Sequence, residues 1–226
     1  MRRSVLLGMR PGVVHGFSTV DDCAASLRPP VPPGAWRGLA LAVGAPELPV
    51  AWMSQVHGAA VLEADAPGPV GEADALITRR RGLLLAVRTA DCVPVLVAGP
   101  AGVAAIHAGW RGVAARVVAA AVSALGGASA AVAAVGPAIG GAVYEVGPEV
   151  VDGLRAAGLP EAVFLRPRPG QRPTVDLAAA VAHQLRAAGV GAVEVLPDCT
   201  LRDIRLHSHR RDGDAAGRNA GLVGLR

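Results

Sequence analysis

Short apolar runs that end at glycine, proline or a charged residue recur along the chain. Five of them occupy residues 82–88, 94–99, 102–107, 130–136 and 191–197. Runs of this length, rich in valine and bounded by turn residues, are typical of strands buried in a sheet. The segment that leads to His57 has the same character. The pattern therefore predicts a core built largely from strands.

Longer alanine-rich segments alternate with these runs and have the composition of helices. Three of them occupy residues 110–127, 147–158 and 175–189. Asp176 stands at an N-cap position, and Gly158 and Gly189 stand where helices stop. The proline-rich pieces 28–34 and 166–173 are typical of surface loops. We therefore predict one α/β (α+β) domain over the whole chain, with several hairpins.

Two of the apolar runs form a predicted hairpin. Residues 94–98 and 103–107 flank a turn-like Gly-Pro-Ala-Gly stretch. Pairing about the turn centre places Pro94 opposite His107, so Cys92 lies beside the imidazole. Such a pair can bind a metal or form a nucleophilic dyad. The structural alternative is a buried cysteine beside a capping histidine.

His57 adds a third candidate ligand, since it ends another strand-like run and precedes glycine. With Cys92 and His107 it makes a plausible three-ligand zinc site that leaves one position for water. The chain contains no local pair of the CxxC or HExxH type around these residues. The alternative is that the three are scattered structural residues.

Composition narrows the chemistry further. All 22 basic side chains are arginines, which excludes mechanisms that need a lysine, such as Schiff-base formation. The net charge is +4, but the arginines are scattered and aromatic residues make up only 3%. Few aromatic side chains are therefore present to stack on bases. We expect an anionic small molecule as the partner, and no nucleic acid.

Nothing in the sequence predicts a membrane segment. The first apolar run is broken by Arg10 and Pro11 before it reaches signal-peptide length. The uncharged stretch 118–143 is interrupted by glycine and proline, which indicates a buried helix followed by a strand. We therefore expect a cytoplasmic protein. Its three cysteines cannot all pair, and a disulfide framework is not expected in that compartment.

Several motifs together resemble the YfiH-like family. They are Ser-Gln-Val-His-Gly at 54–58, Thr-Ala-Asp-Cys at 89–92, His-Ala-Gly-Trp-Arg-Gly at 107–112, Gly-Pro-Ala-Ile with Tyr-Glu-Val-Gly-Pro-Glu-Val within 136–150, and Cys-Thr at 199–200 followed by the arginine-rich segment 207–218. They follow the family order from Phe17 onward. The family was long labelled multicopper polyphenol oxidase or laccase. It is now assigned purine nucleoside phosphorylase and adenosine deaminase activities, and its bacterial members are also called peptidoglycan editing factors.

The resemblance implies one zinc per chain, bound by His57, Cys92 and His107. It implies a single-domain sandwich of mixed sheets covered by helices, similar to a bacterial toxin fold that uses a Cys-His pair. The implied reactions are phosphorolysis of adenosine, inosine, guanosine and methylthioadenosine, and deamination of adenosine. The partners are then a purine nucleoside and phosphate, and we expect a monomer.

Further site residues follow from the matched motifs. Cys92 and His107 are candidate catalytic residues, and Asp91 is the candidate proton partner, with a supporting structural role as the alternative. Arg111 begins a predicted helix, where phosphate is favoured. Tyr144 is a pocket residue or a core aromatic. Ser208, His209 and Arg210 are predicted to contact oxyanion or ribose, unless they form a solvated basic tail.

The chain also departs from the family pattern. After Phe-Ser-Thr the family has Arg and a Gly-Gly-Val-Ser segment, whereas this chain has Val20, Asp21, Asp22 and Cys23. These differences predict that the segment from Val20 to Gly34 forms an altered wall of the pocket. Cys199 is expected to be a buried structural thiol. Copper oxidase chemistry is not expected, because coupled copper clusters need more than the six histidines present.

Two other functions remain open from the sequence. One is a hydrolase that edits cell-wall precursors, with Cys92 and His107 as its nucleophilic pair. The other is a catalytically idle binding protein that retains the fold.

Overall fold

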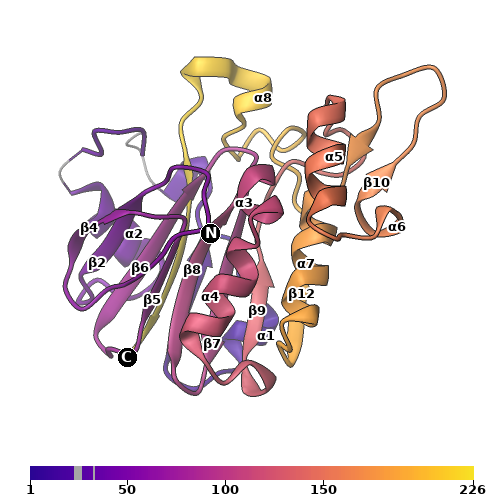
Figure 1. Cartoon of the computed structure of the whole chain (residues 1–226). Coiled ribbons are helices and arrows are strands. Elements are labelled where there is room, and N and C mark those ends of the chain that lie inside the picture. Colours follow the sequence, from indigo (N-terminus) through magenta and orange to yellow (C-terminus); the bar gives the residue numbers. More distant parts are fainter. Residues whose placement is uncertain (23–26, 33) are drawn as a thin grey trace.

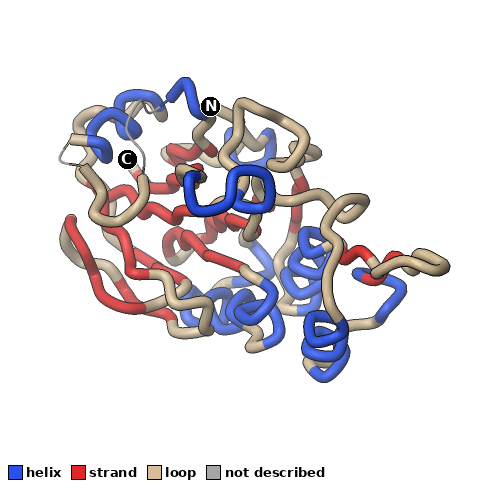
Figure 2. The backbone as a smooth tube through the Cα atoms, turned by 90° about the horizontal axis from the view of Figure 1, so that it is seen from above, coloured by secondary structure: helices blue, strands red, loops and turns tan. Residues whose placement is uncertain are grey.

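The chain folds into two mixed β-sheets packed face to face, with helices on both outer faces (Figure 1). The structure is a computed structural model that describes residues 1–22, 27–32 and 34–226. Seen from above in Figure 2, the strands occupy the middle of the molecule and most helices lie outside them. This arrangement confirms the predicted sandwich of mixed sheets.

The first sheet has five strands within the described residues. Their order is β1 (Val13–Phe17), β13 (Asn219–Leu225), β6 (Leu83–Thr89), β2 (Val50–Ser54) and β4 (Gly68–Glu72). The β1–β13 and β13–β6 pairs are antiparallel, whereas β2 pairs in parallel with both β6 and β4. The last strand of the chain therefore lies inside this sheet, between β1 and β6 from the first half of the chain.

The second sheet has six strands in the described part of the chain. Their order is β12 (Ala192–Val195), β9 (Val132–Val135), β7 (Val93–Gly99), β8 (Gly102–Ala108), β5 (Ala75–Thr78) and β3 (Val61–Glu63). Strands β7 and β8 form the predicted hairpin, and Pro94 pairs with His107 as the turn symmetry required. The five apolar runs predicted as strands correspond to β6, β7, β8, β9 and β12.

Alternating side chains along the strands supply separate core layers. On β6, Leu85 and Val87 face the layer between the sheets, where they join Leu96 of β7. Leu84, the neighbour of Leu85, faces the opposite side and packs with Leu39 of the outer helix. Both faces of these strands are therefore buried, which explains why their sequences are continuously apolar rather than alternating.

The outer layers are helical. The longer helices are α2 (Ala35–Ala42), α4 (Val117–Leu125), α5 (Pro148–Ala156) and α7 (Leu177–Ala187). Residues of α4, α5 and α7 share a buried cluster with the second sheet, while α2 packs on the first sheet. Asp176 caps α7 by accepting a hydrogen bond from the backbone of Ala179 at 2.9 Å. Gly158 and Gly189 follow their helices with positive φ, as helix-ending glycines do.

The predicted helix over 110–127 is wrong in one respect, since it is broken into α3 (Trp110–Ala114) and α4. Arg116 lies between them with φ 62°, in the left-handed region that ends a helix. Its guanidinium donates to the Ala157 carbonyl at 3.0 Å, on the segment that follows α5. This contact with a distant segment is not visible in the local sequence.

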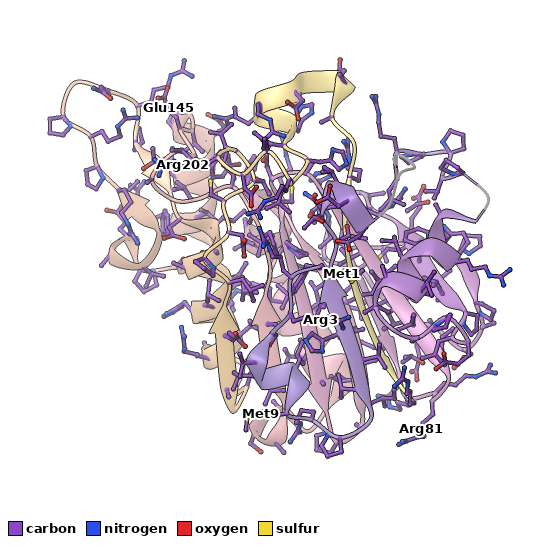
Figure 3. The ribbon with its side chains drawn as sticks, turned by 180° about the vertical axis from the view of Figure 1, so that it is seen from behind. Met1, Arg3, Met9, Arg81, Glu145 and Arg202 are labelled. Atoms are coloured by element: carbon purple, nitrogen blue, oxygen red, sulfur yellow. The ribbon has the colours of Figure 1, made fainter. Side chains whose placement is uncertain are left out.

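Short elements complete the chain. They are α1 (Val5–Gly8), α6 (Glu161–Phe164), α8 (His209–Asp212), β10 (Leu165–Arg166), β11 (Thr174–Val175) and single 3₁₀ turns at Val20–Asp22, Ala128–Ala130 and Gly213–Ala215. Viewed from behind in Figure 3, Glu145 and Arg202 lie at the end of the molecule that carries α8, whereas Met9 and Arg81 lie at the opposite end. None of the described helices has the length and apolar character needed to cross a membrane.

Candidate functional site

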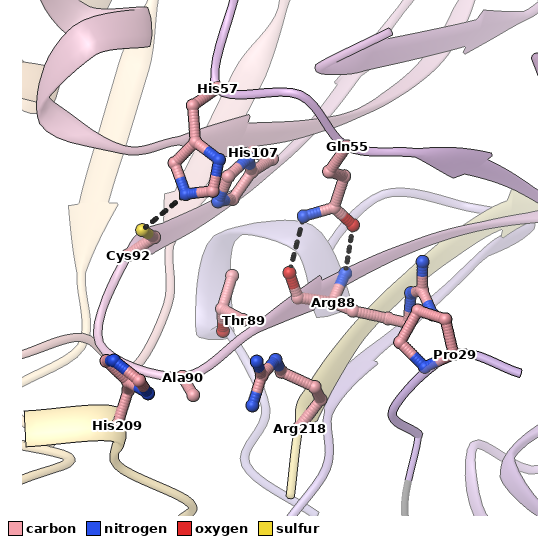
Figure 4. A pocket seen from close by; sticks show the side chains of 10 residues that line it. All are labelled: Pro29, Gln55, His57, Arg88, Thr89, Ala90, Cys92, His107, His209 and Arg218. Carbon is pink, nitrogen blue, oxygen red and sulfur yellow. Dashed lines mark hydrogen bonds between the residues drawn. The ribbon is translucent and has the colours of Figure 1, made fainter. Parts of the chain in front are cut away.

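Three predicted ligands converge at the end of the sheets where α8 lies. His57 stands in the turn after β2, Cys92 immediately precedes β7, and His107 is near the end of β8. Their donor atoms all lie within 4.8 Å of one another. Cys92 Sγ is 3.9 Å from His57 Nε2, and the two imidazoles meet edge to face (Figure 4). Among the described residues, no other group of three such donors is found.

Unusual backbone geometry brings these side chains together. His57 and Asp91 have φ of 62° and 88°, in the left-handed region that non-glycine residues rarely adopt. Such conformations cost free energy and are concentrated at functional sites. Gly109 is required for a different reason: a Cβ there would lie 3.0 Å from His57 Cδ2 and 3.2 Å from Cys92 Sγ.

Asp74 supports both histidines from beneath, although the sequence did not single it out. This fully buried carboxylate accepts hydrogen bonds from His107 Nδ1 at 2.7 Å, from the His57 amide at 2.9 Å and from the Gly58 amide at 2.6 Å. With Nδ1 occupied, His107 presents Nε2 to the site. The one available signal was an aspartate directly before the buried strand β5.

The electrostatics of the triad favour charged side chains. Burial works to raise the pKa of Cys92, but hydrogen bonds and charge from His107 and His57 lower that pKa to about 6. For His107 burial works to lower the pKa, and the bonds to Asp74 and Cys92 raise it to about 9. The same partnership, together with the Gly58 amide, overcomes the effect of burial on Asp74 and holds its pKa below the ordinary value.

The donor set fits a divalent zinc ion. Zinc binds thiolate sulfur and imidazole nitrogen in tetrahedral geometry, in which neighbouring N and S donors are about 3.6 Å apart. The observed 3.9 Å between His57 Nε2 and Cys92 Sγ is close to that spacing. A carboxylate on the far nitrogen of a ligating histidine, as Asp74 is for His107, is the usual support of such sites.

A cavity of about 360 Å³ opens beside the triad (Figure 4). It is lined by Pro29, Gln55, His57, Arg88, Thr89, Ala90, Cys92, His107, His209 and Arg218. Gln55 fixes one wall, because its side chain donates to the Arg88 carbonyl at 2.6 Å and accepts from the Arg88 amide at 2.8 Å. His209 is thus the member of the predicted 208–210 group that faces the triad cavity.

Asp91 and Ser208 have structural partners. Asp91 accepts hydrogen bonds from the Thr200 hydroxyl and from the Arg210 amide, both at 2.6 Å. Ser208 is fully buried and caps α8 by accepting from the Arg211 amide at 3.2 Å. The loop that carries Cys92 is therefore tied to the C-terminal segment, which forms the capped helix α8 while its residues from His209 to Asp212 remain exposed.

Three other predicted residues lie apart from the triad cavity. Arg111 stacks over the ring of Trp110 at 4.5 Å. Arg210 lies 5.4 Å from the Tyr144 ring centre and donates to the Glu145 carbonyl. Tyr144 and Arg210 line a separate cavity of about 340 Å³, together with Trp110. Tyr144 is half-buried at this cavity, and burial raises its pKa.

Of the other two cysteines, the structure describes only Cys199, which is not among the three clustered donors. Cys199, predicted to be a buried structural thiol, is half-buried; it forms an isolated bridge to Ala138, and its sulfur accepts from the Gly140 amide at 3.2 Å. Cys23, and with it part of the predicted altered wall, lies outside the described residues.

Sequence reasoning also missed four residues that line the cavity: Gln55, Arg88, Thr89 and Arg218. All four lie in or next to the family motifs. Gln55 and Thr89 are inside two of these motifs, and Arg88 directly precedes one. Arg218 ends the arginine-rich motif. Their side-chain chemistry, an amide, a hydroxyl and two cations beside a metal-ligand set, was the signal available.

Known proteins resemble this chain in sequence over most of its length. The family model described as multi-copper polyphenol oxidoreductase laccase matches residues 35–226. A protein of Deinococcus radiodurans named purine nucleoside phosphorylase is 40% identical over 224 residues, which cover 96% of this chain and 85% of that protein. A Streptomyces coelicolor protein of the same name is 45% identical over 185 residues, covering 78% of this chain and 75% of its own length.

Solved structures show the same fold. The Neisseria meningitidis protein NMB0706 superposes with a TM-score of 0.84 at 33% identity, covering 96% of this chain and 95% of its own. YlmD from Geobacillus stearothermophilus gives a TM-score of 0.83 at 30% identity, with 96% and 93% covered. Sequence and fold agree, and the chain belongs to the YfiH-like family, whose family model is described as multi-copper polyphenol oxidoreductase laccase.

Proposed function

We propose that this protein is a zinc-dependent purine nucleoside phosphorylase that also deaminates adenosine. The observation that carries the proposal is the His57–Cys92–His107 group at the wall of a cavity large enough for a small ligand. The names of the relatives support the phosphorylase activity. The proposed nucleosides are adenosine, inosine, guanosine and methylthioadenosine, and the proposed metal content is one zinc per chain.

His57, Cys92 and His107 would hold the ion. When bound, zinc supplies Lewis acidity and brings the pKa of a coordinated water to about 7, within reach of neutral-pH hydrolysis. The chain contributes the rest: Asp74 fixes the orientation of the His107 imidazole and holds the backbone at His57, and the low pKa of the Cys92 thiol favours the thiolate form that metals need.

Proton transfer is assigned to groups next to the triad. Asp91 is the proposed proton partner, and its bonds to Thr200 and to the Arg210 amide hold it against the segment that carries His209. These two bonds equally support the alternative, in which Asp91 only positions that segment. His209 itself lines the cavity and is the proposed contact to the nucleoside.

A Cys-His hydrolase is the second candidate, and one observation favours it. Cys92, His107 and Asp74 form a sequence of thiol, imidazole and buried carboxylate, the order in which nucleophilic triads are built. In that reading Cys92 attacks the substrate directly. A muramyl nucleotide bearing a serine is the substrate with which to test it.

The decisive assay is incubation of the purified protein with adenosine, with and without phosphate, and separation of adenine, inosine and hypoxanthine. The proposal predicts adenine only when phosphate is present and inosine in either case. Cys92→Ser should lose both products, while Cys199→Ser serves as the matched control and should keep them. If the wild type forms none of these products and cleaves the muramyl substrate, the hydrolase is correct.

A further inference from the structure

Two arginines face the metal-site cavity without any role in the triad. Arg88 is on β6 and Arg218 directly precedes β13, its neighbour in the first sheet. Both are half-buried and line the same cavity as His57, Cys92 and His107 (Figure 4). The cavity therefore has a metal-ligand wall and a cationic wall.

The charges on this cationic wall lack carboxylate partners. Within the part of the chain that the structure describes, neither guanidinium forms an ion pair. Arg88 donates only to the carbonyls of Leu27 and Met53, and Arg218 to those of Ala216 and Gly217. Two half-buried cations that face the same cavity repel each other, and an anion bound between them would offset this repulsion.

Thr89 supplies an independent observation at the same wall. Its side chain is 2% exposed, and its Oγ1 has no hydrogen-bond partner among the described residues. Buried hydroxyls are almost always paired, because leaving one unpaired costs stability. Thr89 lines the cavity, so a ligand oxygen there would supply the missing partner.

The wall is also held in place before any ligand arrives. Gln55 clamps the backbone of Arg88 on both sides, and two carbonyls hold its guanidinium. A preorganised arginine loses little freedom on binding and makes strong, charge-assisted hydrogen bonds to phosphate oxygens.

We propose that Arg88, Arg218 and Thr89 form the subsite for inorganic phosphate, which rests on the proposed phosphorolysis. A phosphate oxygen attacks C1′ of the nucleoside, and the bond between C1′ and the purine nitrogen breaks with its electron pair on the purine. The proton of hydrogen phosphate passes to the purine, so the products are ribose 1-phosphate and the free base. The cationic wall places positive charge beside the phosphate. It does so in the same cavity that is proposed to hold the nucleoside.

Calorimetric titration of inorganic phosphate at low ionic strength tests the subsite without turnover. Arg218→Gln should raise the Kd for phosphate roughly 10-fold or more, as expected for loss of a charge-assisted bond. Thr89→Val should raise it several-fold without lowering Tm, because its hydroxyl has no internal partner to lose. Arg186→Gln removes a charge from the exposed end of α7 and is the matched control.

Arg88→Gln also removes bonds to the carbonyls of Leu27 and Met53, so its Tm is measured together with its phosphate Kd. If Arg88→Gln does not fold, the result for Arg218→Gln decides whether the subsite is correct. An unchanged phosphate Kd in Arg218→Gln overturns the subsite. Loss of binding in Arg111→Gln or Arg210→Gln alone also overturns it, because the anion then lies where the sequence predicted.

Two further measurements distinguish inorganic phosphate from a phosphate ester, and the phosphate subsite from the proposed phosphorylase activity. Adenosine 5′-monophosphate is titrated in parallel, and binding of this ester with no binding of inorganic phosphate overturns the co-substrate assignment. KM for phosphate in nucleoside cleavage is measured on the same variants and should rise with Kd. Arginine-dependent phosphate binding without any nucleoside cleavage supports the subsite while refuting the proposed function.

Discussion

Replacement of Asp74 by asparagine tests whether the buried carboxylate organises the metal site. Asn keeps the shape, but its amide NH₂ faces one of the donors that Asp74 now satisfies, at His107 Nδ1, the His57 amide or the Gly58 amide. Loss of such a support usually weakens metal binding by about 10- to 100-fold, or roughly 1.4 to 2.8 kcal/mol. One donor left unpaired costs about 1–3 kcal/mol of stability in the metal-free protein.

The same variant should change the pH dependence of metal-free stability. The pKa of His107 is raised from 6.5 to about 9, so its charged form stabilises the fold below pH 6.5, and this contribution is lost as pH rises through about 9. Without the carboxylate the pKa of His107 is raised less. The lowered pKa of Cys92, about 6 against an ordinary 9.0, changes stability in the opposite sense over the same range, so the two slopes nearly cancel in the wild type. In Asp74→Asn the His107 contribution is smaller, so this balance is lost and metal-free stability should rise with pH toward 9.

Zinc competition with a chromophoric chelator measures the affinity, and thermal unfolding of metal-free protein between pH 6 and 9 measures the stability. Asp65→Asn, at an exposed aspartate, is the matched control. Wild-type zinc affinity together with a wild-type pH profile in Asp74→Asn would refute the role assigned to Asp74.

Three further predictions follow from single contacts. Alkylation of Cys92 should be slow in zinc-loaded protein and fast after chelation, since a pKa of about 6 leaves the metal-free thiol largely ionised at neutral pH. Mass spectrometry measures the alkylation rates, and rapid labelling of the zinc-loaded protein would instead favour the hydrolase. Gly109→Ala should reduce zinc content measured by elemental analysis, because its Cβ would crowd His57 and Cys92 at 3.0 and 3.2 Å; unchanged content contradicts this. Asp176→Ala should lower the free energy of unfolding in urea by about 1 kcal/mol through loss of the α7 cap, with zinc content unchanged; equal stability would show that the cap is redundant.

Local signals in the sequence were sufficient for the parts of the site that depend on neighbours in the chain. Apolar runs located the central strands, and the symmetry of one hairpin turn placed Pro94 opposite His107 and Cys92 beside it. His57 came from a strand-like run and the family motif. In the structure, however, β2 ends at Ser54, so a turn rather than the strand end positions this histidine.

Residues that depend on distant pairing were not predictable in the same way. Asp74 reaches His107 because β5 pairs with β8 across a separation of about thirty residues, and nothing local marks that pairing. Arg88 and Arg218 come together because the last strand inserts beside β6. The helix break at Arg116 likewise depends on a contact with Ala157. Periodicity identifies the strands, but it does not specify which edges meet.

The central claim is that zinc held by His57, Cys92 and His107 supports purine nucleoside phosphorolysis. Its most direct test is a titration of zinc into chelator-treated protein, with inosine cleavage in phosphate followed at each step. The account predicts that activity is absent at the start, rises linearly and reaches a plateau at one zinc per chain, with no such rise in Cys92→Ser. Full activity in the metal-free protein, or activity restored by copper and not by zinc, would contradict it.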